Sequence, residues 1–152
     1  MPVTAAQIKQ LREETGAGVL ECKKALTDAA GDYKKAVELV KERGLVKAEK
    51  KSDREIKECA VFSYMHSNNR VAALVELLCE TDFVARNDEF QTLGRNIAMQ
   101  VAAMSPESVD DLLEQEYIRD GGVTIGYLVK ELTGKIGERI AVSRFVRYEL
   151  GN

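Results

Sequence analysis

Three amphipathic segments occupy the first 44 residues of the chain. Thr4 and Gln7 form a capping box at the start of the first segment, and Gly16 is placed to end that helix. A second helix begins near residue 18, and Gly44 is placed to end the third. The inward stripe of the second helix is expected to hold Val19, Cys22, Leu26 and Ala29. The pattern predicts a three-helix module over residues 1–44.

The next segment, residues 45–57, carries charged side chains on nearly every side of any helix it could form. Such a pattern is typical of a solvated helix that joins two modules. We therefore predict a charged helical linker here, with a disordered tether as the alternative.

From residue 58 the hydrophobic period changes to that of strands. Two strands are predicted at residues 59–66 and 71–80, joined by the turn Ser67-Asn68-Asn69-Arg70. The second strand is almost continuously apolar, which predicts a central strand covered on both faces. A helix capped by Asn87 or Asp88 runs to about Met104.

The remaining segments complete an α+β core over residues 58–152. Residues 107–120 hold six carboxylates against one arginine, which predicts an exposed connection, followed by a turn at Gly121-Gly122. A helix capped by Thr124 is expected to end at Gly134 and Gly137, and a closing strand covers residues 139–150. The order of elements predicts an antiparallel three-stranded sheet with helices on one face.

Charge and composition exclude several classes of function. Residues 1–57 hold 13 Lys and Arg against 10 Asp and Glu, and the rest holds 9 against 15. Neither part is basic enough to predict direct nucleic-acid binding. No apolar run reaches the length of a membrane span, so we expect no membrane partner. Three cysteines without a CxxC pair and no recognisable secretory signal favour a reducing, cytoplasmic location.

Candidate reactive residues are few. His66 is the sole histidine, and Cys59 or Cys79 could approach it as a nucleophile. A zinc site would also need Cys22, and the four residues lack the clustered spacing of structural zinc sites. We therefore expect no catalytic residue, no metal and no cofactor, and predict that the protein is not an enzyme.

The segment Thr81–Asn87 lies where the buried strand ends and a helix begins. Asp82 and Phe83 could project from this junction as an exposed carboxylate and apolar ring. Alternatively, Phe83 closes the core and Asp82 caps the following helix. The residue pattern leaves both interpretations open.

Three runs resemble one family. Residues 11–26 (LREETGAGVLECKKAL), 79–87 (CETDFVARN) and 144–151 (RFVRYELG) are similar to bacterial elongation factor Ts. The resemblance implies a ubiquitin-associated-like three-helix module joined to an α+β, dimerisation-type core. It also indicates a departure, because family members usually continue through a further helical segment after Pro106, which this chain lacks.

The resemblance implies a guanine nucleotide exchange factor that acts on the GTPase elongation factor Tu. Thr81, Asp82, Phe83 and Val84 would contact the partner, with Asp82-Phe83 inserted near its magnesium and phosphate site. The positions that would dock the N-terminal module on the GTPase are Arg12, Val19 and Leu20. A weak homodimer is a further expected partner. The alternative is a non-catalytic adaptor whose ubiquitin-associated-like module binds proteins.

Overall fold

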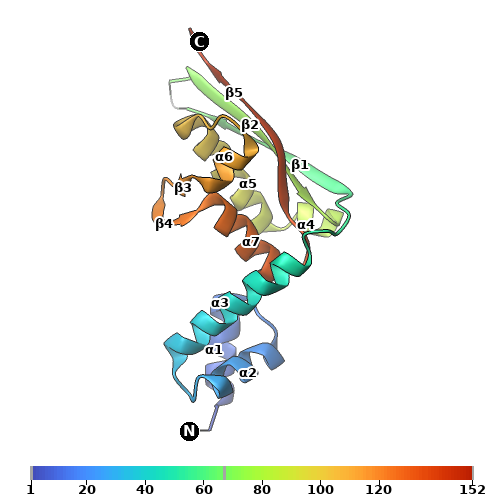
Figure 1. The fold of residues 1–152 in the computed structure, drawn as a ribbon, viewed down its shortest axis with the longest axis vertical. Coiled ribbons are helices and arrows are strands. Elements are labelled where there is room, and N and C mark those ends of the chain that lie inside the picture. Colours follow the sequence, from blue (N-terminus) through green and yellow to red (C-terminus); the bar gives the residue numbers. More distant parts are fainter. Residues whose placement is uncertain (1, 67, 152) are drawn as a thin grey trace.

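A computed structural model describes residues 2–66 and 68–151. The N-terminal helices form one end of an elongated molecule, and a sheet with its helices forms the other (Figure 1). The turn predicted between the first two strands includes Ser67, which lies outside the described residues. Within that turn, Asn69 has the left-handed φ of 58° expected for an asparagine turn.

The N-terminal module consists of α1 (Ala5–Thr15), α2 (Val19–Asp28) and the first half of α3 (Tyr33–Lys50). The predicted capping box is confirmed: Thr4 and the Gln7 side chain each accept from the other's backbone amide. Leu11 and Leu26 are fully buried in a core of their own. Val19 is 48% exposed, so its placement on the inward stripe was wrong; at the first position of α2 its side chain faces solvent.

Helix α3 continues through Gly44 to Lys50, so the predicted helix end at Gly44 is wrong. The reason is a close helix crossing with α7 (Ile125–Ile136), in which Gly44 faces Gly134. A Cβ atom on Gly134 would lie 2.3 Å from the Gly44 carbonyl oxygen. The predicted helical character of the charged segment is confirmed as far as Lys50, while the domain boundaries at residues 44 and 57 stay predictions.

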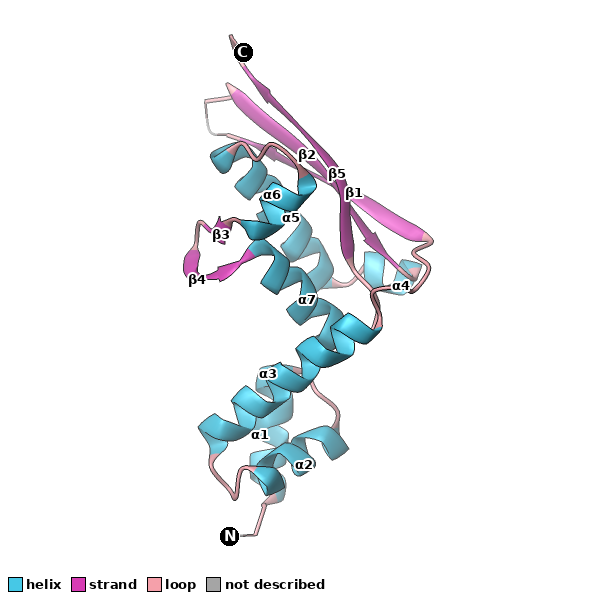
Figure 2. Ribbon diagram, viewed as in Figure 1, coloured by secondary structure: helices cyan, strands magenta, loops and turns pink. Residues whose placement is uncertain are grey.

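The predicted α+β class is confirmed by a sheet of β1 (Glu58–Met65), β2 (Val71–Cys79) and β5 (Ala141–Glu149). The strands are antiparallel in the order β1-β2-β5, which makes β2 central as expected. Coverage of both its faces was wrong. Ala73, Val75 and Leu77 are buried beneath the helices, but Leu74 on the opposite face is 45% exposed. In the described part of the chain no helix lies over that outer face (Figure 2).

One face of the sheet is covered by α5 (Asp88–Met104) and the helices beside it, α6 (Val109–Glu114) and α7. Gly94 lets α5 approach β1, because a Cβ there would lie 2.1 Å from the Phe62 ring. A small hairpin, β3 (Glu116–Tyr117) and β4 (Asp120–Thr124), connects α6 to α7. Its turn lies at residues 118–119, so the turn predicted at Gly121-Gly122 was misplaced; both glycines belong to β4.

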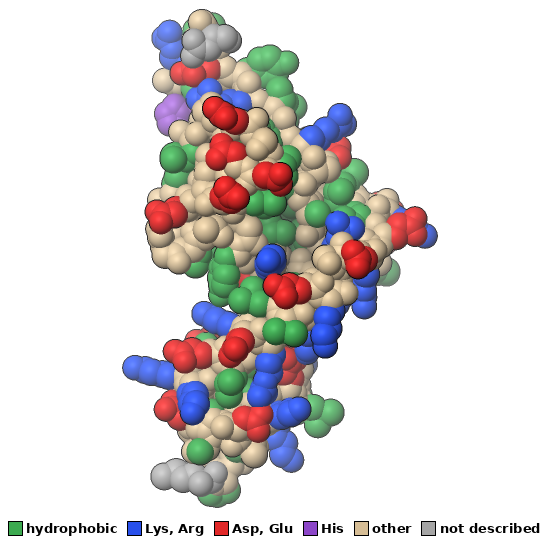
Figure 3. Space-filling view, viewed as in Figure 1, with side chains coloured by type: hydrophobic (Ala, Val, Ile, Leu, Met, Phe, Trp, Pro, Cys, Tyr) green, Lys and Arg blue, Asp and Glu red, His purple; other side chains and the backbone are tan. Residues whose placement is uncertain are grey.

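The acidic connection predicted at residues 107–120 forms α6 and the start of this hairpin. Asp and Glu side chains gather over that part of the surface, whereas Lys and Arg are interspersed with Asp and Glu over the N-terminal helices (Figure 3). Helix α7 begins at the predicted cap, Thr124, and ends at Gly137. No helix in the described part of the chain is long and apolar enough to cross a bilayer.

Candidate functional site

The junction between β2 and α5 presents Phe83 to solvent. Buried Cys79 ends β2, and Thr81 caps the single turn α4 (Asp82–Ala85) by accepting from the Val84 backbone N–H. The Phe83 side chain is 76% exposed and Asp82 is exposed beside it. Of the two interpretations open from the sequence, the exposed pair is therefore confirmed. Phe83 is not a core residue, and the cap is Thr81 and not Asp82.

Val84 has the opposite environment. It is only 6% exposed and packs in the core cluster with Phe90. Of the four motif residues expected to contact a partner, Val84 is the buried one, whereas Thr81 is half-buried and Asp82 and Phe83 are exposed. Its burial fixes the inner side of α4, so that the neighbouring Phe83 ring must face outward.

Arg86 completes the exposed cluster and was not among the predicted site residues. Its guanidinium lies 3.0 Å from an Asp82 carboxylate oxygen and 5.8 Å from the centroid of the Phe83 ring. Arg86 follows Phe83 by three residues and Asp82 by four, which is the spacing of neighbours on one helical face. This spacing is the sequence signal that could have identified Arg86. The cluster combines an apolar ring with an exposed ion pair, a surface suited to a protein partner with its own polar groups.

The predicted N-terminal site residues lie on the other module. Leu20 is 82% exposed at the start of α2, Val19 is about half exposed, and Arg12 is exposed on α1. The structure thus brings Arg12, Val19 and Leu20 onto the helical module and Thr81 to Phe83 onto the core. Two separate surfaces result: α1 and α2 lie at the N-terminal end of the elongated molecule, whereas α4 lies at the edge of the core near the end of α3 (Figure 1).

Comparison with known proteins connects these surfaces to one family. The family model described as elongation factor TS matches residues 80–152, the part that includes Asp82 and Phe83. Elongation factor Ts of Fervidobacterium nodosum is 40% identical over an alignment that covers 99% of this chain and all of the relative. The chain belongs to the elongation factor Ts family. The same protein of Desulforamulus reducens is 39% identical, with 98% of this chain and 89% of the relative covered.

Membership of the elongation factor Ts family confirms the resemblance and gives the chain a role in translation elongation. The alignment with the Fervidobacterium nodosum protein extends over 196 residues, whereas this chain has 152. The relative therefore contains a stretch that this family member lacks. Its expected location after Pro106 stays a prediction.

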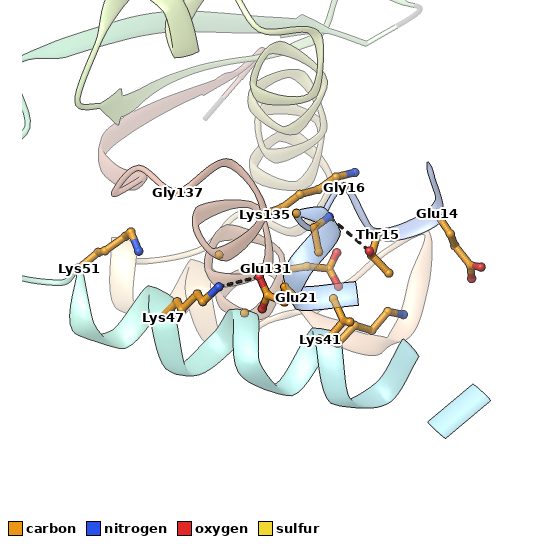
Figure 4. Close-up of a pocket in the computed structure, with 15 residues that line it drawn as sticks. Glu14, Thr15, Gly16, Glu21, Lys41, Lys47, Lys51, Glu131, Lys135 and Gly137 are labelled. Atoms are coloured by element: carbon orange, nitrogen blue, oxygen red, sulfur yellow. Dashed lines mark hydrogen bonds and ion pairs between the residues drawn. The ribbon is translucent and has the colours of Figure 1, made fainter. Parts of the chain in front are cut away.

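A cleft of about 600 Å³ lies between the two parts of this elongation factor Ts family member. The α1–α2 turn, α3 and the end of α7 form its walls (Figure 4). An ion pair of 2.6 Å between Lys47 and Glu21 spans one side. The lining carries both lysines and glutamates, so it lacks the single-sign field of an anion site. Among the described lining residues there is none of the predicted partner-binding residues.

The cysteines do not form a nucleophilic site with the histidine. Cys59 pairs with Leu78 at one end of the hairpin, whereas His66 lies at the other, where its backbone N–H donates to Val71. Burial raises the pKa of the Cys79 thiol to about 11, with the nearby Glu138 charge adding to the effect. A thiol with that pKa holds its proton at neutral pH and is a poor nucleophile.

Proposed function

We propose that this protein is a guanine nucleotide exchange factor that binds elongation factor Tu with GDP and promotes release of the nucleotide. The observation that carries the proposal is the 76% exposed Phe83 ring, set beside Asp82 on a buried strand-to-helix junction. An apolar ring held rigidly in water gains free energy when a partner covers it. Its position in the part of the chain that matches the family model supports the assignment.

The proposed mechanism is a linkage between two binding events. If the factor weakens nucleotide binding by some ratio, the nucleotide weakens factor binding by the same ratio. Magnesium requires near-ideal octahedral geometry, so a wedge near its ligands loosens the nucleotide as well. No covalent bond is made or broken, which agrees with the prediction of a protein that is not an enzyme and needs no cofactor.

Two surfaces serve this mechanism better than one. Burial of a phenylalanine supplies about 1.5–3 kcal/mol, or roughly one to two decades in affinity. We propose that Arg12, Val19 and Leu20 add a second contact that anchors the factor while the core displaces the magnesium shell. The exposure of Leu20 supports this division of roles. The site of action would be the cytoplasm, where translation takes place.

The test is release of fluorescent GDP from elongation factor Tu, measured by stopped flow with the full chain. We expect the release rate to rise with the concentration of the factor and then saturate. A capture experiment with and without excess GDP separates this function from the adaptor alternative. GDP should displace an exchange factor from its partner, whereas an adaptor would stay bound and leave the release rate unchanged.

We also propose that two copies associate weakly through the outer face of the sheet. Val61, Leu74 and Val146 lie on this face and are 62%, 45% and 39% exposed. The Glu76–Arg144 ion pair on the same face limits how tightly apolar surfaces could meet. Sedimentation velocity over a range of concentrations should show a reversible dimer that Val146→Asp abolishes. A monomer at all concentrations would exclude it.

A further inference from the structure

We propose that Glu138 is a positioning residue for the turn that presents Asp82 and Phe83. One Glu138 carboxylate oxygen accepts from the Thr81 backbone N–H at 2.9 Å, and the other accepts from the Thr81 hydroxyl at 2.7 Å. Glu138 lies in the loop after α7, 57 residues away in sequence. The functional consequence rests on the exchange activity proposed above, whereas the structural consequence can be measured without it.

The two bonds act through the cap of α4. Thr81 donates its hydroxyl proton to Glu138, so a lone pair of the same oxygen is directed to the Val84 backbone N–H. That cap bond is long, 3.4 Å, and α4 has only four residues. A single helical turn is not stable by itself in water. The hydrogen bonds within α4 would not keep this turn formed, and the Glu138 carboxylate therefore holds it in place.

A second carboxylate crosses the same boundary in the opposite direction. Glu80 accepts from the Arg139 backbone N–H at 3.1 Å. The segment after β2 and the loop after α7 therefore each supply a carboxylate that accepts from a backbone N–H of the other. Arg54 lies 3.6 Å from the same Glu80 carboxylate and joins the segment that follows α3 to this pair. Adjacent residues on each side, Glu80-Thr81 and Glu138-Arg139, are thus bonded reciprocally. The backbone that carries Phe83 is fixed to the end of α7.

The geometry assigns Glu138 a role that is indirect. The carboxylate is half-buried behind Thr81, while the Phe83 ring and Asp82 face solvent. Loss of Glu138 would leave Phe83 chemically intact but free to sample other orientations. A flexible group must be ordered when it binds, which weakens contacts that depend on orientation.

We expect loss of Glu138 to lower the maximal acceleration of GDP release roughly tenfold, since charge-assisted hydrogen bonds are stronger than neutral ones. The concentration of the factor that gives half-maximal acceleration should change less, because the N-terminal module is untouched.

The experiment compares Glu138→Ala and Glu138→Gln with the matched control Glu114→Ala, which removes an exposed glutamate at the end of α6. Amide hydrogen exchange of the free protein is the first readout. We expect Glu138→Ala to accelerate exchange at Thr81 and Val84 about tenfold while the amides of β2 keep their protection. Glu138→Gln retains one acceptor oxygen, so its amide exchange rates at Thr81 and Val84 should lie between those of wild type and Glu138→Ala. The control should match wild type.

GDP release is the second readout. Unchanged exchange of the Thr81 and Val84 amides in Glu138→Ala, or full acceleration of GDP release by that variant, would overturn the proposal. A wild-type protein that accelerates no release would refute the exchange function and leave the amide measurement as the test of Glu138. If Glu138→Ala does not fold, Glu138→Gln and Thr81→Val remove the same bonds in part and carry the same two readouts.

Discussion

Replacement of Phe83 by alanine separates function from folding. The ring is 76% exposed and lies outside the core cluster, so its removal leaves the interior intact. Its described ring contact is the exposed Arg86 guanidinium at 5.8 Å from the centroid, an interaction of about 0.5–1 kcal/mol at such sites. We expect the free energy of unfolding to fall by no more than about 1 kcal/mol.

The effect on the partner should be larger. About three quarters of the ring surface is free to be covered, and full burial of a phenylalanine is worth about 1.5–3 kcal/mol. The covered fraction therefore supplies roughly 1–2 kcal/mol, or about a 5- to 30-fold change in an equilibrium constant. If that free energy is used to open the nucleotide site, Phe83→Ala should lose most of the acceleration of GDP release.

Stopped-flow release of fluorescent GDP measures this loss directly. Phe83→Leu is the matched control, because it keeps an apolar side chain at the same position and should retain part of the acceleration. Leu20→Ala, on the N-terminal module, should raise the concentration needed for half-maximal effect and leave the maximal rate nearly unchanged. Wild-type rates with Phe83→Ala, or unfolding of that variant in circular dichroism, would refute the reasoning.

Three further outcomes follow from the core. Gly94→Ala should lower stability by about 1–3 kcal/mol in urea denaturation, because the new Cβ would meet the Phe62 ring. A thiol reagent at about pH 8 should modify Cys59 rapidly and the buried Cys22 and Cys79 only after denaturation. The thermal midpoint should fall as pH rises from about 8.5 toward 11, because the folded state keeps the Cys79 proton that the unfolded chain releases. Cys79→Ala should flatten that slope.

Elements whose signals are local could be predicted from the sequence. The Thr4 capping box, the Asn87 cap of α5 and the Thr124 cap of α7 each depend on a side chain within three residues of the amide it accepts from. The start of the strand-rich part was predicted from the change in hydrophobic period at residue 58, and the central place of β2 was predicted from its nearly continuous apolar run. The exposure of the outer sheet face was not predicted. Apolar residues such as Leu74 were read as covered, and the sequence alone does not show whether an apolar strand residue is buried or exposed.

Two glycines that were predicted to end helices have a tertiary role instead. The sequence predicts helix ends at Gly44 and Gly134, since glycine is the commonest residue just after a helix. Both instead lie within helices, where the absence of a side chain lets α3 and α7 cross in contact. A glycine that ends a helix and one that allows a crossing are identical in sequence. The partner helix, which is more than 80 residues away in the chain, decides between them.

The candidate site could be located but not completed from sequence. The motif at residues 79–87 identified Asp82 and Phe83, but the residue pattern left the exposure of the ring open, and the structure decides for exposure. Arg86 belongs to the same helical face, yet its contact with the ring depends on α4 being formed. Glu138 carries no local signal at all, because its bonds to Thr81 join segments that meet only in the folded chain.

The uninterrupted α3 also constrains how this molecule can change in length. An α-helix turns by about 100° and advances 1.5 Å with each residue. One residue inserted between Ala36, buried in the N-terminal core, and Gly44, at the crossing with α7, would rotate Leu20 around the molecule by that angle. Insertions in this helix would therefore turn one of the two proposed docking surfaces relative to the other. The loop between α5 and α6 can gain or lose residues without changing the angle between them.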